Sequence, residues 1–177
     1  MDVIAQTFIT WIEQNQAWLP LIMVVFAAAE TTAFLSILIP STAILVAVGA
    51  LAARDGIAFF PLWAGASVGA LIGSFFSYWL GWRYGAAVLA MRPLRNHPEM
   101  VEKARAAFVR YGPATVLVGH FLTVFRPVVF LLAGMTGMAL ARFAFWNVLG
   151  AVAWAFLIPK LGQFGGDLLG WLWSLLP

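Results

Sequence analysis

The segment from residue 57 to residue 82 carries no charged side chain along its whole length. A helix needs about 20 consecutive apolar residues to cross the hydrocarbon core of a bilayer, and this segment is long enough. Its apolar residues do not alternate strictly with polar ones, and they run far beyond the length of a strand. We therefore predict a transmembrane helix here rather than a strand of a barrel.

The composition of the whole chain agrees with a membrane environment. Hydrophobic residues make up 63% of it and charged residues 10%, whereas an ordinary soluble domain carries about a quarter charged residues. The length leaves room for roughly four to six membrane-entering segments and for little else. We predict a single all-α membrane domain over residues 1–177, with no separate soluble domain.

Several kinds of site and partner are not expected. The chain has no cysteine, which excludes disulfides, a thiolate nucleophile and cysteine metal sites. His97 and His120 lie far apart in sequence, so we expect no metal site. The net charge of +3 comes mostly from one loop, so membrane topology explains it better than a nucleic-acid partner. No Lys or Arg precedes the first apolar run, and no cleaved signal peptide is expected.

The first half of the chain contains an apolar run that a proline interrupts. Residues 1–16 resemble an interfacial start, and residues 17–53 contain Glu30 as their only charge. Because Pro40 falls inside this long run, we predict a helix to about Ala29, followed by a broken or re-entrant segment. Residues 30–82 then form a first hairpin and span. Gly65, Gly69 and Gly73 follow at four-residue spacing, a face that allows close packing of another helix.

Residues 83–112 form the only properly polar region. This region contains six basic residues against Glu99 and Glu102. By the positive-inside rule we predict a basic cytoplasmic loop. The segment that starts at Pro98 resembles the beginning of a short amphipathic helix on the membrane surface.

Residues 113–160 are predicted to form a second hairpin and span, with His120 and Arg126 inside an apolar stretch. Pro127 follows Arg126 at once and breaks the helix where the charge lies. A guanidinium at membrane depth must be paired or meet water, and a broken helix there must be buried in protein or line a cavity. Arg126 therefore marks a polar site. Residues 161–177 are predicted to form an apolar C-terminal helix, either a short last span or an interfacial helix.

A faint internal repeat relates the two halves. Gly49 and Gly65 recur as Gly134 and Gly150, and residues 80–85 resemble residues 161–165 after a four-residue gap. One span ends in the cytoplasmic loop and the second hairpin begins there, so the halves would have opposite topology. Inverted repeats with discontinuous helices are typical of secondary transporters. We predict an inverted-repeat bundle with two facing re-entrant hairpins plus transmembrane helices.

Three side chains in these runs are candidates for contact with a substrate. Arg126 fits the geometry of a phosphate, although a structural ion pair between broken helices is an alternative. Glu30 could titrate, coordinate a substrate, pair with Arg126 or lie in the interface. His120 could act as a proton relay, a second phosphate donor or a hydrogen-bonded core residue. Asn147 and Thr42 are weaker candidates, and either could simply bond across helices.

These residues and their neighbours resemble the DedA family, whose shared region is also called the VTT or SNARE-associated domain. The resemblance covers roughly residues 27–165 and is carried by three pieces of the sequence. These are Glu30 with Pro40 ten residues later, residues 73–85, and residues 119–135 from His120 through Arg126 to Gly134.

The resemblance implies an inner-membrane protein with two re-entrant hairpins that moves lipids across the bilayer. Undecaprenyl phosphate and phospholipids are substrates of different members, and some members depend on the proton-motive force. The chain departs from the family at three positions. Thr42 stands where many members carry an acid, His120 where many carry a first arginine, and Ser74 where Asp or Asn is common. Glu30 and Arg126 carry over directly.

We predict a lipid translocase, of the flippase or scramblase type, for an anionic phospho-lipid such as undecaprenyl phosphate or a phospholipid in the bacterial inner membrane. Arg126, with His120, would bind the phosphate, while Glu30 would pair with Arg126 or titrate. Pro40, Pro127 and Gly134 would support the movement of the hairpins.

The alternative is a proton-coupled secondary transporter of a small solute or cation that uses Glu30 as its coupling acid. An intramembrane enzyme is not expected, because the chain has no His-Glu-x-x-His and no Gly-x-Ser-x-Gly motif. No cofactor is expected beyond coupling to protons. Membrane lipids are the expected partners, and a homo-oligomer is compatible with the sequence.

Overall fold

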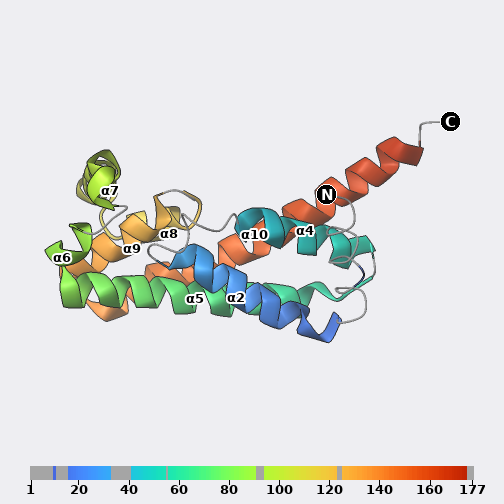
Figure 1. The fold of residues 1–177 in the computed structure, drawn as a ribbon, viewed down its shortest axis with the longest axis horizontal. Helices are drawn as coiled ribbons and strands as arrows, with labels where there is room; N and C mark the ends of the chain where they lie inside the picture. The colour runs from blue at the N-terminus through green and yellow to red at the C-terminus, as the bar shows by residue number, and fades with distance from the viewer. Residues whose placement is uncertain are drawn as a thin grey trace.

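A computed structural model describes residues 10, 16–32, 41–54, 56–90, 94–122 and 125–174 of the chain. Every regular element within these ranges is helical, which confirms the all-α prediction (Figure 1). The helices are α2 (Leu19–Thr31), α4 (Ser41–Arg54), α5 (Phe59–Tyr84), α6 (Ala86–Leu89), α7 (Pro98–Tyr111), α8 (Ala114–Gly119), α9 (Arg126–Met135) and α10 (Leu140–Ser174), with 3-10 turns at Gln16–Trp18 and Leu94–Asn96.

Two helices in the described part of the chain are long and apolar enough to cross a membrane. They are α5, with 26 residues, and the first 23 residues of α10, Leu140–Gly162. The two helices pack against each other and run in opposite directions along the long axis of the molecule (Figure 1). The uncharged segment of the sequence thus forms α5, displaced by two residues at each end.

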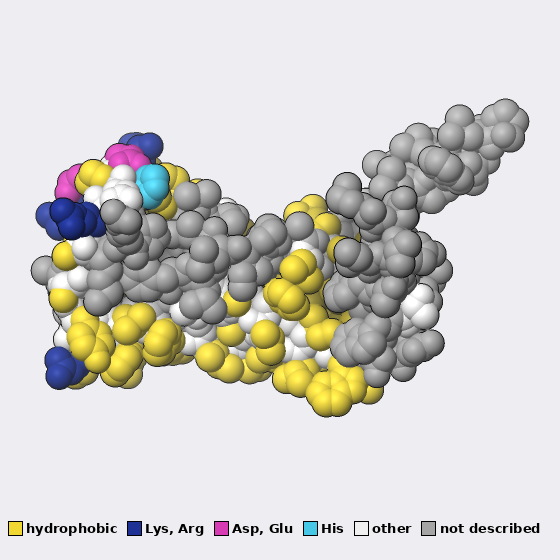
Figure 2. Space-filling view, viewed as in Figure 1, with side chains coloured by type: hydrophobic (Ala, Val, Ile, Leu, Met, Phe, Trp, Pro, Cys, Tyr) yellow, Lys and Arg dark blue, Asp and Glu magenta, His cyan; other side chains and the backbone are white. Residues whose placement is uncertain are grey.

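Large apolar side chains cover the outer surface of these helices. On α5, Val68, Ile72, Phe76 and Trp79 are all more than two-fifths exposed. Charged side chains instead gather at one end of the molecule, over α7 (Figure 2). This distribution suits a bundle whose sides face lipid and whose one end faces water.

The predicted C-terminal boundary near residue 160 is wrong. A single helix continues through Pro159 to Ser174, so residues 161–174 are not a separate helix. A proline inside a membrane helix is tolerated where neighbouring helices support the freed backbone. Helix α4 packs closely on α10 at this point, because a Cβ placed on Gly49 would lie 2.4 Å from the Pro159 carbonyl oxygen.

The basic region 83–112 is more helical than a loop. It begins inside α5 and contains α6 and the predicted amphipathic helix, α7. Pro98 begins α7, and Glu99 and Arg110 lie at the helix ends that suit their charges. A backbone hydrogen bond, followed by one from His97, lowers the pKa of Glu99. Gly112, with a φ of 59°, ends the helix.

The glycine face of α5 packs directly on α2, as its four-residue spacing predicts. A Cβ placed on Gly65 would lie 2.4 Å from the Pro20 carbonyl oxygen, and one on Gly69 would lie 2.2 Å from that of Val24. Gly73 similarly faces the last turn of α2. Only glycine allows the two backbones to approach this closely.

The two halves of the chain also pack on each other reciprocally. Helix α4 crosses α10, and α9 crosses α5. At both crossings each helix contributes a glycine on which a Cβ would lie within 2.4 Å of a carbonyl oxygen of the other helix. The pairs are Gly49 with Gly162 and Gly81 with Gly134. This exchange of partners agrees with the faint repeat that relates Gly49 to Gly134, and two halves related by a two-fold axis would produce it.

The buried apolar side chains form two clusters. The first contains side chains of α5, α7, α9 and α10, among them Tyr78, Phe130 and Phe143. The second contains side chains of α2, α4, α5 and α10, among them Leu45, Ala70 and Trp154. Both α5 and α10 contribute to both clusters, so the region between the clusters lies partway along these two long helices.

We expect Gly69→Ala to destabilise the protein by about 1–3 kcal/mol, because the new methyl group would separate α2 from α5. Thermal unfolding of the detergent-solubilised protein, followed by circular dichroism, measures the effect. Gly165→Ala is the matched control, since a Cβ at Gly165 in α10 would meet nothing within 4 Å. Equal unfolding temperatures for the two variants would contradict the packing assigned to Gly69.

Candidate functional site: a buried ion pair between two helix ends

Glu30 and Arg126 form an ion pair inside the bundle. Nη1 of Arg126 donates to Oε1 of Glu30 at 2.9 Å, and the two side chains are 0% and 2% exposed. Glu30 lies in the last turn of α2, and Arg126 is the first residue of α9. The pair therefore joins the end of one helix to the beginning of another.

Hydroxyl groups form several hydrogen bonds at the end of α2. Thr31 and Thr32 donate through Oγ1 to the carbonyl oxygens of Ala27 and Ala28, at 2.8 and 2.7 Å. The Ser77 hydroxyl on α5 donates to the Thr31 carbonyl oxygen at 2.9 Å. Of these acceptors, the Thr31 carbonyl is one of the last of α2 and has no donor within the helix, whereas the Ala28 carbonyl also accepts from the Thr32 backbone N–H at 3.0 Å. These bonds hold Glu30 at a buried helix end.

The break before α9 places Arg126. Helix α8 ends at Gly119, and α9 begins at Arg126 with Pro127 directly after it. Nη2 of Arg126 donates to the backbone carbonyl of His120, a group that lies in the break. The Arg126 Cζ atom also lies 4.4 Å from the ring centroid of Trp154 on α10. The guanidinium thus contacts a carboxylate, a carbonyl and an aromatic face.

A second set of buried polar groups runs beside the ion pair. Nε2 of His120 donates to Oδ1 of Asn147 at 2.9 Å, and Nδ2 of Asn147 donates to the Ser74 hydroxyl at 2.8 Å. All three side chains are fully buried. Nδ1 of His120 has no hydrogen-bond partner among the described residues. A neutral imidazole with its hydrogen on Nε2 fits this arrangement, because a buried charged ring would need a second partner.

This chain of hydrogen bonds lies between the two apolar clusters. Ser74 on α5 and Asn147 on α10 are each about one helical turn from a member of either cluster. The chain joins α5, α10 and the break before α9. The polar residues thus form a layer partway along the two membrane-crossing helices.

The predicted site residues divide into three groups. Glu30, Arg126, His120 and Asn147 come together, although the imidazole of His120 hydrogen-bonds to Asn147 and only its backbone carbonyl contacts Arg126. Gly134 lies at the crossing of α9 with α5, against the Tyr78 carbonyl. Pro40 and the side chains of Thr42 and Pro127 lie outside the described residues, so their supporting roles stay predictions.

Two contacts were missed from the sequence. Trp154 falls seven residues after Asn147, which places both on one face of a helix, and this spacing is a signal that could have found it. The sequence marks Ser74 only as a departure from the family, at a position where Asp or Asn is common, and does not predict that it belongs to the site. Within the described ranges, no group of three or more His, Asp or Glu side chains could hold a metal ion.

We expect Arg126→Met alone to cost about 3–5 kcal/mol, because it leaves a carboxylate buried without its cation. The double variant Glu30→Met/Arg126→Met should lose less free energy of unfolding than either single variant, since it removes both charges. Chemical denaturation of the three variants in detergent, as a double-mutant cycle, measures the coupling. Additive losses would show that the two side chains do not stabilise each other.

Comparison with known proteins places the chain in a family. The profile of the VTT domain matches residues 39–164. The chain is 29% identical to the inner membrane protein YabI of Escherichia coli, over 87% of the chain and 59% of YabI. It is 32% identical to the inner membrane protein YghB of Salmonella typhimurium, over 70% and 57% of the two chains. It is 33% identical to an uncharacterized membrane protein of Synechocystis, over 72% and 60%.

These relatives are named as membrane proteins, and none of the three names describes an enzyme. The chain spans about three-fifths of the length of the curated relatives it matches. No solved structure matches it. The family match covers well over half of the sequence, several relatives are inner membrane proteins, and two long apolar helices are present. The chain therefore belongs to the VTT-domain, or DedA, family of inner membrane proteins.

Proposed function

We propose that this protein is a lipid translocase that moves an anionic phospho-lipid, such as undecaprenyl phosphate or a phospholipid, across the bacterial inner membrane. The observation that carries the proposal is the Arg126–Glu30 pair, buried where two helices end inside an apolar bundle. An ionisable pair at such a place is expensive, and in membrane proteins it marks a substrate or ion pathway by default.

The guanidinium of Arg126 suits a phosphate. Its donors form a planar fork that matches carboxylate and phosphate oxygens equally well. In the structure the Glu30 carboxylate accepts from one arm of this fork. A lipid phosphate would replace Glu30 on that arm, while the His120 carbonyl and the Trp154 ring keep the guanidinium in place.

The placement of the two charges favours exchange over a purely structural role. An acid at a helix C-terminus and a base at a helix N-terminus each oppose the helix dipole, at about 0.3–1 kcal/mol apiece. Each charged side chain is therefore stabilised at its helix end by the other and not by the helix dipole. Hydrophobic residues of similar volume often stabilise a buried site better than an ion pair does. We infer that the pair serves a state in which an anion replaces Glu30.

The movement would use the two broken segments as facing re-entrant hairpins. One would be formed by the end of α2 with α4, and the other by α8 with α9. When the lipid phosphate takes Arg126, Glu30 would take up a proton, because a neutral acid costs far less than a carboxylate in an apolar interior. The lipid tail would stay in the bilayer while the head group crosses at Arg126.

A second candidate is a proton-coupled transporter of a small solute or cation. The buried chain of His120, Asn147 and Ser74 favours it, since hydrogen-bonded histidines at membrane depth are used as proton relays. In that case Glu30 would be the coupling acid. The two candidates differ in whether a lipid phosphate is moved.

The test uses purified protein in liposomes that contain a fluorescent undecaprenyl phosphate analogue or, separately, a fluorescent phospholipid. Loss of outer-leaflet signal to an impermeant quencher reports translocation. We expect Arg126→Ala to slow it by about 10- to 100-fold, as the loss of a charged hydrogen bond implies. The Arg126→Lys variant should also translocate lipid slowly, because lysine lacks the planar pair of donors that an arginine offers to a phosphate.

Arg142→Ala is the matched control, since Arg142 is an exposed arginine in the first turn of α10. It should translocate lipid at the wild-type rate. Unimpaired transport by Arg126→Ala would remove Arg126 from the site. If the wild type accelerates the translocation of neither lipid, even with an imposed proton gradient, the result favours a transporter of a small solute or cation.

A further inference from the structure

A groove runs beside α7, away from the ion pair. Helix α7 packs on α9 through its buried residues Met100, Val101 and Ala104. Next to this contact lies a groove of about 200 Å³ between α7 on one side and α8 and the start of α9 on the other. We call it the α7 groove. Its walls include Lys103, Ala107, Tyr111, Val118, Leu122 and Phe125.

The α7 groove is apolar except at Lys103 and two hydroxyl groups. The hydroxyl of Thr115 is already used, because it donates to the Ala107 carbonyl at 2.9 Å. The ammonium of Lys103 lies 5.7 Å from the centroid of the Phe125 ring, which is itself a wall of the groove. Within the described residues no ion pair joins Lys103 to a carboxylate. The groove thus offers apolar walls with one cation, which also lies near enough to Glu99 to contribute to the lowered pKa of that carboxyl.

The α7 groove opens onto a surface that suits lipid. Val118 and Leu122, on its rim, are 46% and 44% exposed, and Tyr111 is 57% exposed. Such contiguous exposed apolar side chains belong against an apolar medium rather than water. An occupant can therefore enter sideways from the bilayer, with its apolar part along the groove and its polar part at Lys103.

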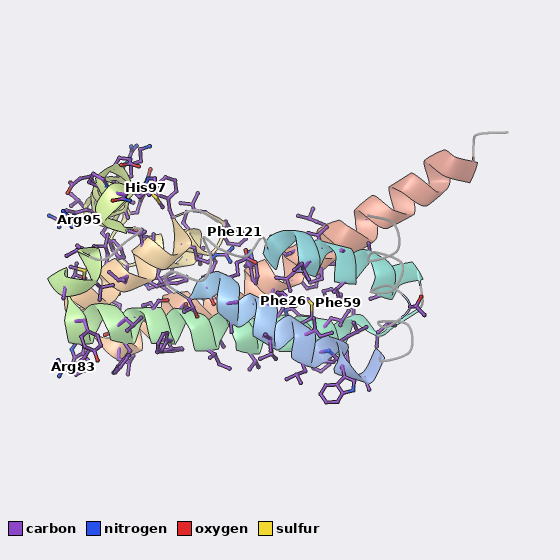
Figure 3. The ribbon with its side chains drawn as sticks, in the orientation of Figure 1. Phe26, Phe59, Arg83, Arg95, His97 and Phe121 are labelled. Atoms are coloured by element: carbon purple, nitrogen blue, oxygen red, sulfur yellow. The ribbon has the colours of Figure 1, made fainter. Side chains whose placement is uncertain are left out.

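The charge on α7 is basic on balance, since its three basic residues outnumber its two acidic ones: Lys103, Arg105 and Arg110 against Glu99 and Glu102. Arg83, Arg95 and His97 lie at the same end of the molecule as α7 (Figure 3). Arg105 borders a second cavity on the other side of α7. Basic segments next to the membrane on the cytoplasmic side attract anionic lipids. A zwitterionic lipid would gain less here, because its own cation would repel Lys103.

We propose that the α7 groove binds an anionic glycerophospholipid of the surrounding membrane. The phosphate lies at the Lys103 ammonium, and the first part of an acyl chain lies against Ala107, Val118 and Leu122. Leu122, on the rim, and Phe125, in the wall, belong to the turn that leads into α9, so the bound lipid braces the segment that positions Arg126. This site is a place of equilibrium binding and does not depend on lipid translocation.

The test compares lipid binding by the full chain in detergent, measured by native mass spectrometry. The probes are phosphatidylglycerol and phosphatidylcholine with the same acyl chains. The wild type should bind phosphatidylglycerol more tightly, and Lys103→Gln should weaken that binding about fivefold, as expected for one basic residue near an anionic lipid. Arg110→Gln is the matched control, because Arg110 lies on the same helix but borders neither cavity.

A second variant tests the apolar part of the α7 groove. Ala107→Phe would fill it without a change of charge and should weaken the binding of both lipids. The proposal is overturned if the wild type shows no preference for phosphatidylglycerol, or if Lys103→Gln and Arg110→Gln weaken binding equally. The second result would indicate diffuse attraction to α7 as a whole. If Ala107→Phe does not fold, the comparison of Lys103→Gln with Arg110→Gln decides.

Discussion

A helix that ends inside an apolar bundle must satisfy its terminal backbone groups without water, and the architecture of this protein depends on how that is done. At the end of α2 the Ser77 hydroxyl donates to the Thr31 carbonyl, and the Thr32 backbone N–H donates to the Ala28 carbonyl. At the break before α9 the guanidinium of Arg126 takes the carbonyl of His120. Arg126 therefore satisfies a backbone carbonyl and also forms an ion pair. A helix break in this position leaves a carbonyl that needs a donor, and the arginine that supplies it here also binds the Glu30 carboxylate.

The close approach of the helices follows from glycine and explains how the ion pair can be so well enclosed. Where Gly69 faces Val24, and where Gly134 faces Tyr78, backbone lies directly on backbone. Contacts of this kind depend on van der Waals packing rather than on interlocked large side chains. Helices that meet through smooth backbone surfaces can separate without first disengaging side chains, whereas the polar layer holds them in register. In the proposed opening of the bundle, the ion pair of Glu30 and Arg126 is thus the main contact that must break.

Much of this arrangement could be predicted from local patterns. The uncharged segment gave α5, the four-residue glycine spacing predicted the face that meets α2, and the charges at Glu30 and Arg126 marked the residues that meet in the bundle. Other features depend on contacts that no local pattern contains. Pro159 looks like a helix end by itself, yet α10 continues through it where α4 packs against its carbonyl. The spacing of Trp154 from Asn147 places both on one helix face, but the contact of Trp154 with Arg126 follows only from the fold. The partner of the His120 imidazole likewise became evident only when α10 was placed beside the break.

The predicted repeat accounts for how the helices cross, whereas the ion pair does not follow from it. The reciprocal crossings of α4 with α10 and of α9 with α5 use glycines in both halves, as the predicted repeat implies. The chemistry is not symmetric, because the acid comes from α2 in one half and the guanidinium from α9 in the other. An ion pair that joins the two halves links their movement, since neither half can shift far while the pair is intact. A ligand that competes for the guanidinium would act on both halves together. An anion that replaces Glu30 on Arg126, as proposed, would break the contact between the halves at a guanidinium that also holds the His120 carbonyl.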